Sequence, residues 1–122
     1  MNEDNKNYLC VAFKSVDGVS KCGSYTGDGT TNGSKEITLG FAPKLLIVKG
    51  IDNGTHHWDV FDTTRGFGAG VACNYLRLNS TTDQGDYGTG VIEKSSTSFT
   101  VGCNGTSALN ADGREHIYYA HA

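Results

Sequence analysis

The sequence predicts an all-β protein, a compact antiparallel β-sandwich of about nine short strands joined by long Gly/Ser/Asn-rich loops. Clusters of Gly, Asn, Asp and Ser interrupt short apolar runs at the spacing of sandwich proteins, about 8–12 residues per strand. Seventeen glycines, one proline and 37% apolar residues fit this loop-rich class. No segment has the 3.6-residue period of an amphipathic helix. At 122 residues, the chain is long enough for one domain with one core.

The N-terminal third begins with a β-rich run, Tyr8–Phe13, which is expected to be the first strand. A Val-Asp-Gly turn at residues 16–18 leads into a second strand over Val19–Tyr25. The segment Thr26–Ser34 is polar and rich in residues that adopt positive φ, so it predicts a long turn region. A strand over Glu36–Leu39 follows.

The middle of the chain holds its most apolar stretch, Leu-Leu-Ile-Val within Lys44–Lys49, which predicts the central core strand. The single proline ends the preceding turn, Gly40–Pro43, because its ring fixes φ. Asp52–Thr55 contains Asn-Gly and predicts a hairpin turn. The next strand, His57–Asp62, carries bulky residues on both faces, so we expect it to be covered on each side.

The last part of the chain alternates between loops and strands. Arg65–Gly70 is a glycine-rich loop, Asn74–Asn79 alternates as a half-buried strand, and Ser80–Gly90 is a long polar loop. Three further strands are expected over Val91–Glu93, Ser98–Gly102 and His116–His121.

The two ends of the chain share a sequence pattern, a polar turn followed by a β-rich run. Residues 2–13 reappear at residues 110–121. This echo predicts a unit of a tandem array, in which residues 1–13 close a preceding unit and residues 14–122 form a single sandwich domain. The alternative is that two ordinary strands share this pattern by chance. The matched pairs are Asn2/Asn110, Asp4/Asp112, Lys6/Arg114, Leu9/Ile117 and Ala12/Ala120, with Tyr8/His116 a looser pair.

Charge and composition exclude several classes of partner. The net charge is −3 and no basic stripe exists, so no nucleic-acid partner is expected. No run approaches the roughly 18 apolar residues of a membrane span, and the acidic N-terminus lacks the apolar region of a signal peptide. The four cysteines show no zinc spacing and are expected to be reduced structural thiols; the alternative is disulfides, if the protein acts outside a cell.

Paired histidines next to a tryptophan suggest a metal site. Neighbouring residues of a strand point to opposite faces, however, so His56 and His57 cannot both ligate one ion from one chain. His116 and His121 also fall on opposite faces of the last strand. We therefore expect no metal and no cofactor.

No catalytic group is predicted either. The Gly66–Gly70 segment lacks the lysine and the following helix of a phosphate-binding loop. Two carboxylates, Asp59 and Asp62, lie on opposite faces of a straight strand, so they do not form an acid–base pair.

Exposed aromatic rings among Asn/Asp/Gly loops are the remaining functional signal, because aromatic faces stack on sugar rings. Arg65 follows Asp62 by three residues, and its first expected role is to brace this loop through an ion pair. The loops expected to hold a ligand are Asp52–His57, Gly66–Gly70 and Ser80–Tyr87. The candidate binding residues are His56, His57, Trp58, Arg65, Phe67 and Tyr87.

The order of several motifs over nearly the whole chain resembles the glycine-rich β-domain of tailed-bacteriophage fibre-like and other virion proteins. The chain departs from that pattern at Cys22, at His121 and at the histidines before Trp58. The motifs are Tyr8–Phe13, Gly23–Gly29, Leu39–Lys49, Trp58–Gly66, Tyr75–Ser80, Phe99–Gly102, Leu109–Gly113 and Ile117–Ala120.

The resemblance implies a virion structural or adhesion module, such as a tail fibre, spike or capsid-surface appendage, assembled in the host cytoplasm. It implies a homotrimer, other virion proteins as partners, and a host-surface glycan or protein as a target. It carries no catalytic residues. The alternatives are a free-standing carbohydrate-binding, lectin-like module and a polysaccharide hydrolase domain, which would need paired carboxylates in a cleft.

Overall fold

Nine strands and one short 3₁₀ helix make up the regular structure of the described residues. The structure is a computed structural model and describes residues 4–8, 10–31, 35–52, 56–68, 70, 72–103 and 109–122. The elements are β1 (Ser20–Thr26), β2 (Lys35–Thr38), β3 (Leu45–Gly50), β4 (Asp59–Asp62), η1 (Thr63–Arg65), β5 (Asn74–Arg77), β6 (Gly85–Asp86), β7 (Ile92–Lys94), β8 (Ser98–Val101) and β9 (Glu115–His121).

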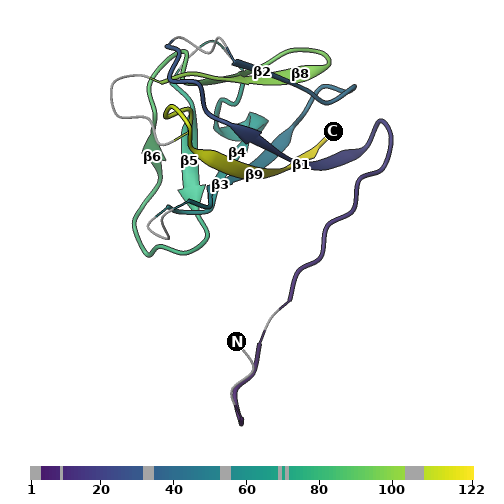
Figure 1. Cartoon of the computed structure of the whole chain (residues 1–122), viewed down its shortest axis with the longest axis vertical. Helices are drawn as coiled ribbons and strands as arrows, with labels where there is room; N and C mark the ends of the chain where they lie inside the picture. The colour runs from purple at the N-terminus through teal and green to yellow at the C-terminus, as the bar shows by residue number, and fades with distance from the viewer. Residues whose placement is uncertain are drawn as a thin grey trace.

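These strands form two antiparallel sheets that pack face to face (Figure 1). The larger sheet has six strands in the order β1-β9-β3-β4-β5-β6, and the smaller has three in the order β2-β8-β7. The predicted antiparallel sandwich is confirmed. The most apolar run became β3, an interior strand of the larger sheet. It pairs with a neighbouring strand along each of its two edges, as expected for a strongly apolar run.

The last strand occupies an interior position between two earlier ones. Seven residue pairs join β9 to β1, from Ser20/His121 to Thr26/Glu115. On its other side, β9 pairs with β3 from Leu45/His121 to Gly50/His116. The C-terminal strand therefore completes the centre of the sheet.

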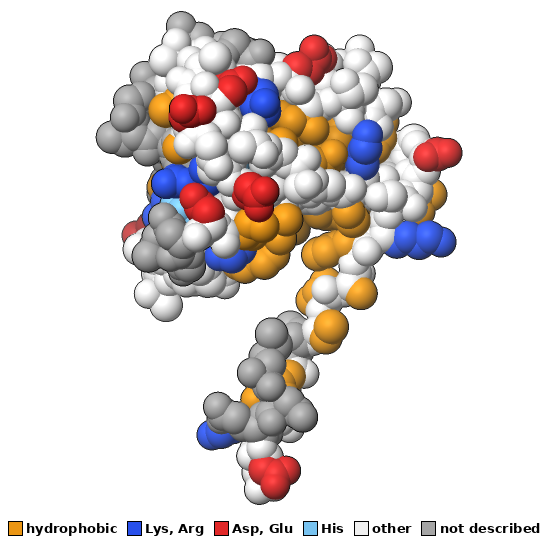
Figure 2. Space-filling view, viewed as in Figure 1, with side chains coloured by type: hydrophobic (Ala, Val, Ile, Leu, Met, Phe, Trp, Pro, Cys, Tyr) orange, Lys and Arg blue, Asp and Glu red, His pale blue; other side chains and the backbone are white. Residues whose placement is uncertain are grey.

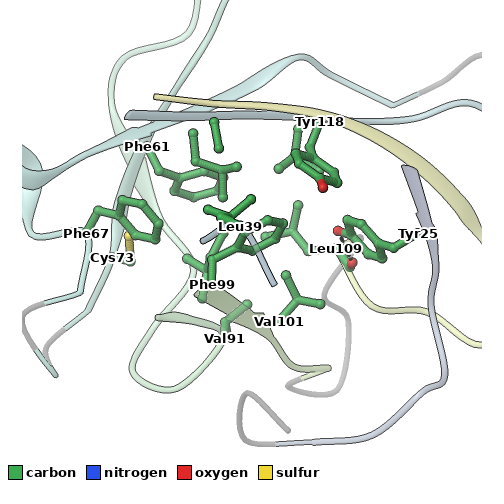
Figure 3. Packing of buried hydrophobic residues seen from close by; sticks show 14 of the residues in the cluster. Tyr25, Leu39, Phe61, Phe67, Cys73, Val91, Phe99, Val101, Leu109 and Tyr118 are labelled. Carbon is green, nitrogen blue, oxygen red and sulfur yellow. Dashed lines mark hydrogen bonds between the residues drawn. The ribbon is translucent and has the colours of Figure 1, made fainter. Parts of the chain in front are cut away.

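The core lies between the two sheets (Figure 3). Inward residues alternate along each strand, as a half-buried pleated strand requires. In β3 these are Leu46 and Val48, and both are fully buried. The rest of the core cluster comprises Tyr25, Leu39, Phe41, Phe61, Phe67, Cys73, Val91, Ile92, Phe99, Val101, Leu109, Tyr118 and Ala120.

Two element predictions need correction. The described residues of Tyr8–Phe13, the expected first strand, do not form a strand, because no neighbouring strand pairs with them. They extend away from the body instead (Figure 1). Within the expected loop Ser80–Gly90, the short strand β6 pairs with β5. The hairpin turn predicted for Asp52–Thr55 falls largely on residues 53–55, which lie outside the described residues.

A buried asparagine fastens the long polar turn after β1 to the turn before β9. Asn110 is fully buried, and its side-chain amide donates to Asp28 Oδ1 at 2.9 Å and to the carbonyl of Thr30 at 3.0 Å. Its Oδ1 accepts from the backbone N–H of Asp28 at 3.2 Å. The turn following β1 is thus held by one side chain from the far end of the chain.

Acid should weaken this turn through Asp28. Hydrogen bonds from the Thr30 side chain and backbone and from Asn110 hold the pKa of Asp28 well below its usual range. A lowered folded-state pKa gives stability that is complete above the usual carboxyl pKa and is lost as pH falls below it. We therefore expect Asp28→Asn to lower the urea midpoint near neutral pH, and the difference from the native chain to shrink between about pH 5 and about pH 2. A difference that stays constant over this range would contradict this role for the Asp28 charge.

Gly27 has no room for a side chain. A Cβ placed there would lie 2.1 Å from the carbonyl oxygen of Ala111, a backbone atom that cannot rotate away. We expect Gly27→Ala to cost about 2–3 kcal/mol of unfolding free energy, the scale of overpacking in a close contact. Ser24→Ala, at an exposed site of the preceding strand β1, should change it by less than about 0.5 kcal/mol. Urea unfolding of both variants measures the difference, and equal effects would rule out the steric explanation.

Candidate functional site

The candidate residues just before β4, His57 and Trp58, lie beside the turn that follows β5. The backbone N–H of Trp58 donates to Asn79 Oδ1 at 3.0 Å, and His57 Nδ1 lies 3.3 Å from the same oxygen. The amide side chain of Asn79 therefore fixes where these two residues stand. Of the loops predicted to hold a ligand, the end of Asp52–His57 and the end of Ser80–Tyr87 come together in the pocket described next, through His56, His57 and Tyr87.

His56, His57 and Tyr87 share a single small pocket of about 50 Å³. Ligand sites for small molecules are usually about 300–1,000 Å³, so this pocket admits a few water molecules and not a sugar ring. Its other lining residues are Gly50, Asp59, Arg77 and Leu109.

The floor of the pocket is a buried polar network centred on Asp59. The Asp59 side chain is almost fully buried and accepts from Arg77 Nε at 3.1 Å and from the Tyr87 hydroxyl at 2.8 Å. Burial and the nearby Asp59 charge raise the pKa of Tyr87 far above its usual range. Burial alone lowers the pKa of Arg77, but hydrogen bonds to Tyr87 and Asp59 outweigh it and raise that pKa. The network thus holds a charged pair and a neutral phenol, and these states favour structural support over proton transfer at neutral pH.

His56 occupies the pocket wall without a hydrogen bond on Nε2. That atom is 3.3 Å from Asp52 Oδ1, an ion-pair distance without hydrogen-bond geometry. Its ring fits because residue 50 is glycine, where a Cβ would lie 2.8 Å from the imidazole. Arg114 Nε donates to the other oxygen of Asp52 at 3.2 Å.

A metal site finds no support in the described part of the chain. No three His, Cys, Asp or Glu side chains there come close enough together to hold an ion. On the last strand, His116 is buried and its ring stacks on Tyr25 at 4.7 Å, whereas His121 is exposed. The prediction that these two histidines point to opposite faces is confirmed. The four cysteines are free thiols, and burial raises the pKa of Cys73 to about 11.

Arg65 and Phe67 have structural positions away from the pocket. The Asp62 carboxylate caps η1 by accepting from the backbone N–H of Arg65, and it also pairs with the Arg65 guanidinium. This is the predicted brace. Phe67 is only 2% exposed and packs against Phe61 at a ring-centroid distance of 6.4 Å. Because its ring is in the core, Phe67 is not available to stack on a ligand, and its interpretation as a binding residue is withdrawn.

Trp58 lies on the opposite side of the larger sheet from the core. It lines a groove of about 400 Å³ with Val11, Phe13, Ile47, Leu78 and Asn79. A second groove of about 370 Å³ adjoins it and extends over Cys22, Ile117 and Tyr119. Both volumes fall within the range of ligand sites, about 300–1,000 Å³. The Lys49 ammonium lies 5.6 Å from the centre of the Trp58 ring.

These grooves belong to an apolar band across the outer face of the larger sheet. The strand registers place five side chains in one row over β1, β9, β3, β4 and β5. The flanking positions Ile117, Trp58 and Leu78 are also apolar. The band is called the outer row, and its members are Cys22, Tyr119, Ile47, Val60 and Leu76.

An outer row of this composition is unusual, because the outward face of an antiparallel sheet is normally polar. Leu78 is 67% exposed. In Figure 2, hydrophobic side chains gather on the underside of the body beside the extended N-terminal segment. The sequence signalled this face only through the bulky residues on both sides of His57–Asp62. The expectation that this strand is covered on each side holds for the core face, whereas Trp58 and Val60 on the other face are half-buried.

No helix in the described part of the chain is long and apolar enough to cross a membrane.

Comparison with known proteins gives one match. No curated protein and no solved structure matches the chain. A family model described as a domain of unknown function, DUF7483, matches residues 1–122. Because the match spans the whole sequence, the chain belongs to the DUF7483 family.

Proposed function

We propose that this protein is a structural and adhesion module of a bacteriophage virion, in a tail fibre, spike or capsid-surface appendage. The proposal rests on the order of motifs that resembles virion β-domains and on one observation about the surface, the apolar outer row. Its partners are other virion proteins and further copies of itself, as a homotrimer, and its target is a glycan or protein of the host surface.

The outer row supports a component of a larger assembly over a free-standing module. Contiguous apolar surface on a soluble domain marks a contact with another body. Here such surface extends across five neighbouring strands, from Cys22 on β1 to Leu76 on β5. A lectin-like module that acts alone has no use for this face, and its exposure would promote aggregation.

Recognition of a host surface falls to the loops beside the small pocket. The segments around His57 and Asn79 lie together, and loops on a rigid scaffold are the usual place for recognition. Since the pocket volume is about 50 Å³, a glycan would lie across the loop surface and not inside the pocket. His56, His57 and Tyr87 remain the binding candidates there.

The test is the solution mass of the purified chain by light scattering at two protein concentrations, followed by a screen of bacterial surface polysaccharides. A trimer whose mass does not change on dilution, with binding to a polysaccharide, is the expected result. A monomer that binds a polysaccharide would favour the lectin-like alternative. A monomer that binds none would overturn the adhesion role.

A further inference from the structure

The extended N-terminal segment, residues 4–13, repeats the segment that closes the sheet, and we call it the arm. The sequence echo pairs Asp4 with Asp112 and Ala12 with Ala120. The backbone repeats it as well. Asn5, at the position equivalent to Gly113, has φ of 61°, and Gly113 has φ of 70°. Asn5 is the one non-glycine residue with positive φ among the described residues, so the arm keeps the turn of β9 although no sheet holds it.

The residues shared between arm and β9 are ones that a closing strand needs. Asn110 is the buried side chain that holds the turn after β1, and Ala120 is fully buried between the sheets. Arg114 pairs with Asp52. In the sequence echo, residues 2–13 carry Asn2, Lys6 and Ala12 at these three positions. A strand that matches by chance would have no reason to keep this set.

The arm nevertheless has no core to enter in this chain. Every described residue from Asp4 to Val19 is exposed, including Tyr8 at 53%, Val11 at 62% and Phe13 at 48%. Full burial of a large apolar side chain is worth about 1.5–3 kcal/mol, and leaving these three about half exposed forgoes part of that for each. The arm therefore has the composition of a packed strand without its sheet.

The arm also stands beside the outer row. The Phe13 ring stacks on Tyr119 at a centroid distance of 4.2 Å. Val11 and Phe13 line both grooves, opposite Ile47 and Trp58. By the echo, Val11 and Phe13 correspond to Tyr119 and His121, which are outer-face positions of β9. The outer side of the arm thus faces the outer side of the sheet.

We propose that the outer row is the docking surface for a second β-domain of this family, which precedes this one in the same polypeptide and takes the arm as its last strand. The two larger sheets then pack outer face to outer face, in the way aligned sheets pack at about 10 Å. Tyr8, Cys10 and Ala12 enter the core of that neighbour, as His116, Tyr118 and Ala120 enter this one. The inference rests on the proposed function only in treating this face as an assembly surface.

A two-unit chain tests the proposal. Residues 14–122 are joined directly after His121 of a full chain, so that β9 of the first unit replaces the arm of the second. Trp58→Phe in the first unit leaves one tryptophan as a probe, and circular dichroism checks that both units fold. We expect the emission of the remaining Trp58 to shift to the blue and its quenching by acrylamide to fall several-fold relative to the single chain.

A charge on the docking surface provides the matched control. Leu78→Lys in the second unit alters a side chain that is already 67% exposed, so it leaves folding intact. It should restore the quenching of Trp58 to the value of the single chain. Thr38→Lys, at an exposed position of the smaller sheet, adds the same charge and should leave Trp58 protected.

Two results would overturn the proposal. One is equal quenching of Trp58 in the single chain and the two-unit chain. The other is protection of Trp58 in the single chain that grows with protein concentration, because the face would then bind a separate copy. A single chain that forms a trimer, together with a two-unit chain whose Trp58 is quenched as strongly as in the single chain, would leave the virion proposal standing while the tandem contact fails.

Discussion

Phe61→Ala is expected to reduce the unfolding free energy by about 4 kcal/mol, the scale for removing a buried aromatic ring. Phe61 is fully buried in the core, on the same side of the cluster as Phe67 (Figure 3). Its ring packs against Phe67, Tyr75 and Tyr87 at centroid distances of 6.0–6.4 Å. These three rings come from separate segments, so the cavity left by alanine cannot close by moving one of them. Urea unfolding followed by tryptophan fluorescence measures the loss.

The adjacent residue supplies the control for this prediction. Val60 is on the same strand but belongs to the outer row and is half-buried, so Val60→Ala removes less buried volume and should cost less than about 1.5 kcal/mol. Phe61→Leu should fall between the two variants because it restores most of the lost volume. If Val60→Ala proved as costly as Phe61→Ala, the assignment of Val60 to a face outside the core would be wrong.

Asp59→Ala is expected to cost about 3 kcal/mol, because it leaves Arg77 partly buried without its partner. The Arg77 side chain is 24% exposed, so water relieves part of the penalty and the loss stays at the lower end for a buried pair. The substitution also leaves the Tyr87 hydroxyl without its acceptor. The measurement is the free energy of unfolding in urea near neutral pH.

Two companion variants separate the parts of this network. Tyr87→Phe removes one hydrogen bond to a charged acceptor and should cost about 1–2 kcal/mol. Asp59→Ala combined with Arg77→Met removes both charges and should recover part of the loss of Asp59→Ala. A double variant as unstable as the sum of its single changes would show that the two side chains do not act as a pair.

The strands built from apolar runs were predictable from the sequence, and those built from backbone pairing alone were not. The run around Ile47 and the closing run around Tyr119 became interior strands, because a short continuous apolar run of this length fits a strand buried in a sheet. The strand β6 has two residues, Gly85 and Asp86, which is too short for a periodic pattern. Residue 85 is glycine because the Tyr75 ring packs closely against its backbone: a Cβ would lie 2.5 Å from the Tyr75 hydroxyl.

The candidate site was predictable in part, and its misses have physical causes. Because side chains alternate between the two faces of a strand, Asp59 lies on the same face as Phe61. This is the core face. An aspartate is kept there by Arg77, a partner from the next strand in the sheet, and that pairing depends on register that the sequence does not reveal. Glycines surround Phe67 in the sequence, which predicts an exposed loop residue. The turn η1 brings it back over β4 instead, where its N–H donates to the carbonyl of Asp62 at 3.0 Å.

The place of β9 between β1 and β3 has a consequence for synthesis. A ribosome releases β1 and β3 early, yet the gap between them stays empty until the C-terminal strand emerges, so the larger sheet closes only after translation of the domain is complete. Throughout that interval, the edges of β1 and β3 that later pair with β9 are unpaired. Unpaired strand edges are templates for pairing with other chains, so the unfinished domain is most open to aggregation just before its last strand emerges.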